Sequence, residues 1–258
     1  MTVHPSYGLS LTVVGSGSAY ARGAGRASSC YLVEHAGAAI VLDLGQGSFA
    51  ALADLLPPES VLAVFISHLH PDHGVDLVAL RHYLKYGLPT PGHVALHAPH
   101  DLRRRYDVLL GEEDFLADLP GDPVVPGERT VGPFIVTAAR VTHTESSFGF
   151  RVAVAGAEHA PGLVYSGDCG RADDLLPLLR PGDTLLSEAS FGDLARIPDV
   201  AHLTAVEAAL AAREGRAARL VLTHLLDEAD AETSLALAAG TFRGPVELAR
   251  PGLRVPIR

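Results

Sequence analysis

The chain has 258 residues, of which 48% are hydrophobic and 19% charged, a balance typical of globular domains and unlike that of a disordered protein. Its formal net charge of −10 disfavours a partner as acidic as a nucleic-acid polymer. The only basic run, Arg103-Arg104-Arg105, is expected to be a solvated helix face. The chain contains no run of about 18 apolar residues, so no membrane-spanning helix is expected. Its two cysteines do not form a C-x-x-C pair, which fits a reducing, cytoplasmic location.

The first part of the chain predicts short strands and helices. Strands are expected at residues 9–14, 30–34, 39–43, 61–67 and 94–97. The second and third strands flank Ala36-Gly37, a pair that favours a hairpin turn. Leucines at helical spacing between residues 77 and 88, and the composition of residues 101–110, predict two helices.

The second part predicts further strands, expected at residues 134–139, 148–155, 163–166, 184–188 and 219–223. A helix lies between the last two, because Thr204 and Glu207 have the spacing of a capping box, and it ends at Gly215. Residues 120–127 resemble a loop that is too short to separate domains, so we expect one domain over residues 1–258. Strands with interleaved helices favour an α/β fold with two mixed β-sheets flanked by helices, an αββα sandwich.

Four side chains of the kind that bind metals lie within six residues after the strand at 61–67. They form the pattern His68-x-His70-x-Asp72-His73. In an extended segment His68 and His70 project on the same side, and Asp72 and His73 then turn at the start of the next helix. Imidazole and carboxylate groups suit zinc, manganese or iron. The pattern therefore predicts a metal-dependent hydrolase.

A two-metal site needs more than these four ligands, so further ligands are expected at the ends of later strands, where loops collect to build a site. Three residues fit this expectation: His143, Asp168 and His224 each follow a predicted strand.

Taken together, these motifs resemble the metallo-β-lactamase fold superfamily and, within it, the RNase Z-like branch of phosphodiesterases. Besides the histidine cluster and the three later ligands, the matching motifs are Gly15-Ser16-Gly17-Ser18, Leu42-Asp43-Leu44-Gly45, Ser166-Gly167-Asp168, Ser187-Glu188-Ala189, His202-Leu203-Thr204 and Thr223-His224. The resemblance covers nearly the whole chain. It implies a homodimer and two divalent metal ions per chain, with zinc favoured over manganese or iron.

The resemblance also implies which residues hold each ion. The first ion would be held by His68, His70 and His143, the second by Asp72, His73 and His224, and Asp168 would bridge the two. Asp43 would support the ligand loop from behind, as carboxylates outside a coordination shell often do.

Two metal ions about 3.5–4 Å apart can share a water, lower its pKa and supply a bridging hydroxide that attacks a phosphodiester. The leaving oxygen then needs a proton donor. His202 is the candidate, because it precedes the capped helix and lies outside the seven ligand positions. The resemblance points to the same residue, since phosphodiesterases of this branch carry a histidine in an H-x-T element. Glu188 is expected to form a hydrogen bond with His202, and Thr204 is expected to support His202 from behind. Asp72 is expected to take part in catalysis as well as in metal binding.

The expected substrate is a small phosphodiester such as a cyclic nucleotide. The alternative within this branch, a tRNA 3′-processing endonuclease, carries a long tRNA-gripping arm between the motifs that match His143 and Asp168. Those residues are 25 positions apart here, and two predicted strands and a turn fill the interval. Hydrolysis of a lactone or thioester is a further alternative, whereas a non-catalytic protein of this fold would have lost ligands.

Overall fold

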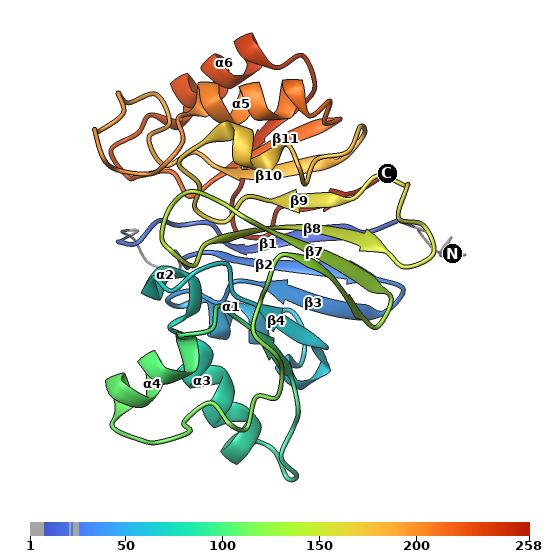
Figure 1. Ribbon diagram of the computed structural model, residues 1–258, viewed down its shortest axis with the longest axis vertical. Coiled ribbons are helices and arrows are strands. Elements are labelled where there is room, and N and C mark those ends of the chain that lie inside the picture. The colour runs from blue at the N-terminus through green and yellow to red at the C-terminus, as the bar shows by residue number, and fades with distance from the viewer. Residues whose placement is uncertain (1–7, 21, 23–25) are drawn as a thin grey trace.

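In the computed structural model, which describes residues 8–20, 22 and 26–258, two β-sheets pack face to face (Figure 1). The strands of the first sheet lie in the order β13 (Arg254–Pro256), β1 (Ser10–Gly15), β2 (Cys30–His35), β3 (Ala38–Leu42), β4 (Ala63–Phe65) and β5 (Ala95–His97). Pairing is antiparallel from β13 to β3 and parallel from β3 to β5. The carboxyl ends of β3, β4 and β5 therefore lie at one edge of this sheet.

The second sheet is also mixed. Its strands lie in the order β12 (Val246–Leu248), β11 (Arg219–Thr223), β10 (Thr184–Glu188), β9 (Leu163–Tyr165), β8 (Phe148–Val154), β7 (Phe134–Arg140) and β6 (Gly127–Val131). Pairing is parallel from β12 to β9 and antiparallel from β9 to β6. The strands that precede Asp168 and His224, and the strand that ends at Glu188, are thus parallel neighbours.

Helices cover the outer face of each sheet, as predicted (Figure 1). The helical elements are α1 (Ser48–Ala53), η1 (Pro58–Ser60), α2 (Pro71–Gly74), α3 (Leu77–His82), η2 (Tyr83–Gly87), α4 (Leu102–Leu110), η3 (Ala172–Leu175), α5 (Ala205–Glu214) and α6 (Ala231–Thr241). Helices α1, α3 and α4 pack on the first sheet, whereas α5 and α6 pack on the second. Alanines make up the buried face of α5, and their small side chains let the helix lie close to the sheet.

Aromatic side chains fill the space between the two sheets. Tyr31 and Tyr165 approach to 4.9 Å between ring centroids, and Phe65 and Phe150 to 5.8 Å, each pair joining one sheet to the other. Burial of large aromatic groups is a major stabilising contribution in such a core. This apolar contact fixes the relative position of the strand ends that carry the polar residues.

Several elements were not predicted, and one predicted helix changes form. Strands β6, β12 and β13, helices α1 and α6, and the short turns η1 and η3 lie in segments that we had not assigned. The helix expected between residues 77 and 88 is α-helical as far as His82 and continues as a π-helical turn, η2. Within the described part of the chain, every helix is too short or too polar to cross a membrane.

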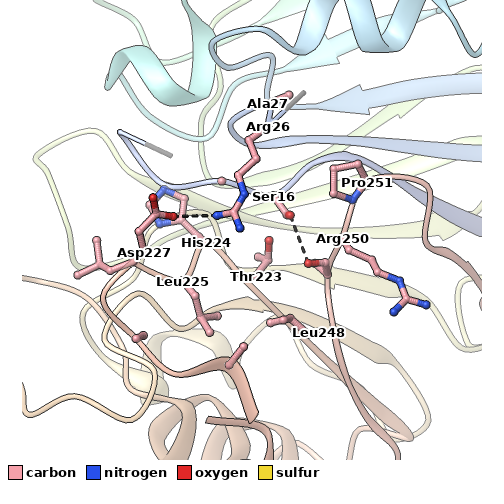
Figure 2. Close-up of a pocket in the computed structure, with 15 residues that line it drawn as sticks. Ser16, Arg26, Ala27, Thr223, His224, Leu225, Asp227, Leu248, Arg250 and Pro251 are labelled. Carbon is pink, nitrogen blue, oxygen red and sulfur yellow. Dashed lines mark hydrogen bonds and ion pairs between the residues drawn. The ribbon is translucent and has the colours of Figure 1, made fainter. Parts of the chain in front are cut away.

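Two cavities of about 270 Å³ each lie at the edge where the parallel strands end. The first borders His224 and lies among the turn at Ser16, the segment after β11 and the segment after β12 (Figure 2). Arg26 and Asp227 form an ion pair of 2.9 Å beside it. The second lies between α2 and α4 and includes His70.

Candidate metal centre

The histidine cluster follows β4 at the carboxyl edge of the first sheet. His68 is fully buried, whereas His70 is exposed at the end of the extended segment. Pro71 then occupies the first turn of α2, a position that its fixed φ angle favours. The helix directs Asp72 and His73 back towards the strand ends, and both are buried. This local geometry is the strand-to-helix turn expected from the sequence.

Asp43 anchors the cluster from behind. Its Oδ1 accepts a hydrogen bond from the Ser67 backbone N–H (2.6 Å), and its Oδ2 accepts from the Ser67 hydroxyl (2.8 Å) and from the Tyr165 hydroxyl (2.6 Å). The same Oδ2 lies 2.7 Å from Nδ1 of His73. A proton on that Nδ1 leaves Nε2 of His73 free to face the other ligands. Asp43 adopts a φ of +58°, a left-handed conformation that aspartate tolerates better than most residues.

The structure brings His68, His70, His143 and Asp168 into one group whose ligand atoms lie within 4.8 Å of one another. Nδ1 of His70 lies 3.0 Å from Nε2 of His68 and 3.1 Å from Nε2 of His143. Oδ2 of Asp168 lies 3.6 Å from both of those Nε2 atoms. His143 follows β7 in the second sheet, so this group joins side chains from both sheets.

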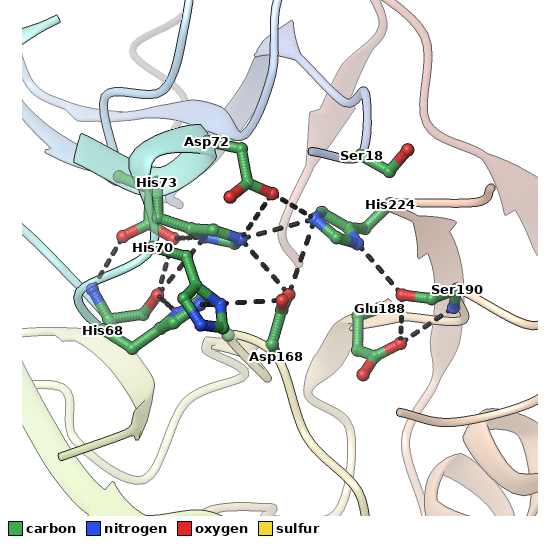
Figure 3. Close-up of polar contacts among 12 residues, drawn as sticks. Ser18, His68, His70, Asp72, His73, Asp168, Glu188, Ser190 and His224 are labelled. Carbon is green, nitrogen blue, oxygen red and sulfur yellow. Dashed lines mark hydrogen bonds and ion pairs between the residues drawn. The ribbon is translucent and has the colours of Figure 1, made fainter. Parts of the chain in front are cut away.

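A second group consists of Asp72, His73 and His224. Nε2 of His224 lies 3.1 Å from Oδ2 of Asp72 and 3.3 Å from Nε2 of His73. Oδ1 of Asp168 lies 3.3 Å from Nε2 of His73 and 3.7 Å from Nε2 of His224 (Figure 3). Asp168 therefore faces both groups, one with each carboxylate oxygen.

Buried charge sets the electrostatics of these groups. Burial, together with the neighbouring His73, holds the pKa of His68 well below its usual value. Burial would also lower the pKa of His73, but the carboxylates of Asp168 and Asp43 outweigh it and hold that pKa well above the usual value. Burial opposes ionisation of Asp168, yet His224 and His73 keep its pKa well below the usual value. The centre thus holds an ionised carboxylate among imidazole rings.

The donor set fits divalent metal ions. Three pairs of imidazole nitrogens lie 3.0 to 3.3 Å apart. In each pair only one nitrogen can carry a proton towards the other, so the other nitrogen presents a lone pair. Among the described residues, Oδ1 of Asp168 is buried without a hydrogen-bond partner, although buried carboxylates normally have one. A cation would satisfy this oxygen and the facing lone pairs together. Histidine with aspartate is a ligand mixture suited to zinc, manganese or iron.

His202 and Glu188 lie beside this centre as a bonded pair. Nδ1 of His202 lies 2.9 Å from Oε1 of Glu188, and 3.9 Å from Oδ2 of Asp168. Burial would lower the pKa of His202, but the hydrogen bond and charge of Glu188 raise it above the usual value. Glu188 is held in turn by the backbone N–H groups of Cys169 (2.9 Å) and Ser190 (2.8 Å). His202 also forms a possible ligand group with Asp168 and His224.

Thr204 supports this pair only indirectly. It is the N-cap of α5, with its hydroxyl accepting from the Glu207 backbone N–H (3.2 Å), and the Glu207 side chain accepts from the Thr204 backbone N–H (2.8 Å). This is the predicted capping box, and it fixes the helix start two residues after His202. In the described chain, the hydrogen bonds of the Thr204 hydroxyl involve Glu207 alone.

Two residues at the centre were missed from the sequence. The Ser190 hydroxyl contacts Oε2 of Glu188 (2.9 Å), Nδ1 of His202 (3.1 Å) and Nδ1 of His224 (3.0 Å). Tyr165 bonds Asp43 across the two sheets. Ser190 lies two residues beyond a strand end that already carries Glu188, a position that could have marked it. Tyr165 has the pattern of an ordinary core residue.

Comparison with known proteins identifies the family. The model of the beta-lactamase superfamily domain matches residues 40–225. An uncharacterized protein of Mycobacterium tuberculosis is 34% identical over 220 residues, which are 80% of this chain and 77% of that protein. The probable metallo-hydrolase YhfI of Bacillus subtilis is 26% identical over 95% of this chain and 98% of its own.

Solved structures agree with this assignment. The crystal structure of YhfI, a metallo-β-lactamase fold protein, superposes with a TM-score of 0.84 at 24% identity, over 96% of this chain and 99% of that one. The short form of human tRNase Z superposes with a TM-score of 0.74 at 25% identity, over the same shares of the two chains. The chain belongs to the metallo-β-lactamase fold superfamily, in its RNase Z-like branch of metallo-hydrolases.

Proposed function

We propose that the protein is a dinuclear metal-dependent phosphodiesterase that acts on a small phosphodiester such as a cyclic nucleotide. The observation that carries this proposal is the position of Asp168, with one oxygen towards each ligand group and the His202–Glu188 pair beside it. A hydrolase for diesters needs both a site for the anionic phosphate and a proton donor for the leaving oxygen. The two parts lie side by side here.

Seven side chains would hold the metal ions in this proposal. They are the two groups described above with Asp168 shared between them. Zinc is the ion we favour, with manganese or iron as alternatives, since these ligands suit all three. When bound, such ions supply an activated water and offset the negative charge of the substrate.

His202 would donate the proton to the leaving oxygen. Because Glu188 engages Nδ1 of His202, its Nε2 is the nitrogen available to the substrate. Glu188 fixes the tautomer and favours the protonated ring, a role that carboxylates commonly play beside catalytic histidines. Asp72 would take part through its contact with His224, and Asp43 would keep His73 in place. His70, His143 and His202 are the more exposed members, so substrate would approach from their side.

The size of the substrate follows from the segment between His143 and Asp168. Strands β8 and β9 and the turn between them occupy this segment, so it contains no protruding arm. The net charge of −10 also disfavours a large polyanion. Similarity to human tRNase Z makes a tRNA 3′-processing endonuclease the alternative, and a lactone or thioester hydrolase is a second one. A homodimer and a cytoplasmic location stay predictions.

A substrate panel tests the reaction class. The purified protein, loaded with Zn²⁺ or Mn²⁺, is incubated with bis(p-nitrophenyl) phosphate, adenosine 3′,5′-cyclic phosphate, a pre-tRNA, a lactone and a thioester. We expect turnover of the first two. Cleavage of the lactone or thioester without either diester would contradict the proposal, and preferential cleavage of pre-tRNA would favour the endonuclease.

A variant tests the role of His202. His202→Ala is expected to keep its metal content and to lose roughly 10²–10⁴-fold in kcat, the usual contribution of a general acid. The control is His100→Ala, because the side chain of His100 is 87% exposed and contacts only Asp101 among the described ion pairs. Equal kcat values for the two variants, with equal metal content by elemental analysis, would remove the proposed role.

A further inference from the structure

The cavity between α2 and α4, here called the α2–α4 pocket, adjoins the metal centre. Its volume is about 270 Å³, and His70 belongs both to its lining and to the first ligand group. The rest of the lining is largely apolar and includes Leu69, Val75, Leu102 and Leu109. A molecule bound at the metal centre could therefore extend directly into this pocket past His70.

The floor of the pocket is well fixed. Tyr106 lines it, is buried, and donates a hydrogen bond from its hydroxyl to the backbone carbonyl of Gly74. Leu102, one turn earlier in α4, is 2% exposed and packs in the core beneath the first sheet. These contacts tie α4 to α2, so the pocket exists before a ligand enters, as most small-molecule sites do.

One cationic group lines the pocket, and it differs from its neighbours. Arg103 donates to the carbonyls of Leu116 and Leu119, and Arg104 lies 4.0 Å from Asp101. Arg105 lines the pocket, and its guanidinium has no hydrogen-bond or ion-pair partner among the described residues. Arg104 and Arg105 are both exposed, as expected for a solvated face, and Arg105 is the member of the run that also borders the pocket. An unpaired arginine is notable in a protein of net charge −10.

We infer that the α2–α4 pocket binds the base of a nucleotide substrate, and that Arg105 is a specificity-determining residue that contacts the edge of the base. This inference rests on the proposed function. Apolar side chains suit the flat faces of a nucleobase, and guanidinium N–H groups suit the acceptor atoms along its edge. The volume lies near the lower end for small-molecule sites, so it fits one base rather than a run of them.

Two pairs of variants on α4 test the pocket. Leu109→Trp fills it, whereas Val108→Trp adds the same group to the adjacent position, which is 76% exposed and outside the lining. Arg105→Ala removes the free guanidinium, and Arg104→Ala removes its neighbour. For adenosine and guanosine 3′,5′-cyclic phosphates, we expect Leu109→Trp and Arg105→Ala to raise KM about tenfold with little change in kcat. The two controls, Val108→Trp and Arg104→Ala, should match the unaltered enzyme in both KM and kcat.

A binding experiment separates this inference from the proposed reaction. The unaltered chain and the two arginine variants contain no tryptophan, so the fluorescent nucleoside 2-aminopurine riboside can be titrated against a low background, and each tryptophan variant is corrected with a titration that omits the nucleoside. We expect saturable binding that Leu109→Trp and Arg105→Ala weaken and the controls do not. Such binding in a protein that hydrolyses no phosphodiester would support the pocket and overturn the reaction. Hydrolysis of cyclic nucleotides with the same KM in Leu109→Trp and Val108→Trp would overturn the pocket and keep the reaction.

A second copy of the chain is the competing occupant, because Leu109 is 65% exposed and lies next to exposed Val108. Sedimentation velocity of the same variants decides between the two. An unchanged oligomeric state in Leu109→Trp supports a ligand pocket. A shift of both tryptophan variants to a smaller species, with nucleoside binding unaffected, would overturn the inference.

Discussion

Replacing Asp43 with asparagine tests how the ligand loop is held. Asparagine preserves the volume of the side chain and tolerates the φ of +58° found at this position. The carboxylate is fully buried. Its two oxygens accept hydrogen bonds from the Ser67 backbone N–H, the Ser67 hydroxyl and the Tyr165 hydroxyl, and Nδ1 of His73 is a fourth contact. An amide offers one oxygen and one NH₂ group. Whichever way it is oriented, the NH₂ group faces either the Ser67 backbone N–H or the side of His73.

The expected effect follows from this mismatch. A buried donor left without its acceptor costs about 1–3 kcal/mol, and the hydrogen bonds to the lost negative charge were among the stronger ones. We therefore expect Asp43→Asn to lower the free energy of unfolding by roughly 2–4 kcal/mol. Because His73 loses the partner that orients its Nδ1, metal affinity should fall by about 10–100-fold.

The assay compares unfolding by urea with zinc titration against a competing chelator. Asp183→Asn is the matched control, since Asp183 is also fully buried but pairs with Arg151 at 2.8 Å, outside the ligand groups. It should lose stability and keep the metal affinity. The reasoning is refuted if Asp43→Asn binds zinc as tightly as the unaltered protein, or if the two variants lose affinity equally.

Three further predictions concern stability. Chelation of divalent ions should lower Tm in scanning calorimetry and zinc should restore it, since a ligand at a thousandfold excess over Kd stabilises the folded state by about 4 kcal/mol; an unchanged Tm would be contrary evidence. Thr204→Ala removes the capping box with Glu207 and should cost about 1 kcal/mol in urea unfolding. Gly167→Ala combines a φ of +57° with a Cβ 2.6 Å from the Phe148 carbonyl oxygen, and should destabilise by more than about 2 kcal/mol. Gly37→Ala is the control, because Gly37 also has a positive φ (+82°) but an added Cβ there would meet no atom within 4 Å. It introduces the backbone strain without the steric clash, so it should lower the free energy of unfolding by less than Gly167→Ala does.

The sequence anticipated which side chains come together better than it predicted the outer parts of the fold. Each expected ligand follows a strand, and parallel strands bring their carboxyl ends to one edge, so position in the chain was enough to place them. The His202–Glu188 contact could also be anticipated, because Glu188 ends a strand and His202 directly precedes the capped helix. Which nitrogen of each imidazole faces inward depends on partners such as Asp43 and Ser190 and could not be read from the sequence.

The missed elements lack the periodic signals on which such predictions depend. Strand β6 is an edge strand of mostly exposed residues, so it has no buried run. Strands β12 and β13 have three residues each, and β13 ends in Pro256, which is tolerated at a sheet edge. Helix α6 buries only Ser234 and Ala238, which leaves no apolar stripe. The structure of these segments is therefore determined by their contacts with the rest of the fold rather than by a local sequence pattern.

The contact between Tyr165 and Asp43 shows why the remaining details are tertiary. Tyr165 lies in a short buried strand of the second sheet, and its hydroxyl reaches a carboxylate at the end of β3 in the first. No local pattern links residues 122 positions apart. Its role depends on how the two sheets face each other, which the aromatic core determines.

The origin of the ligands in two sheets has a consequence for how the protein is made. His68, His70, Asp72 and His73 are synthesised early, yet the side chains that complete both groups follow strands of the second sheet. On the ribosome, the nascent chain would carry this histidine-rich loop through most of its synthesis without the groups that enclose it. The first group is complete once Asp168 has emerged, but the second is complete only after His224 has emerged and β11 has paired with β10, so loading of a second ion would be one of the last steps of biogenesis.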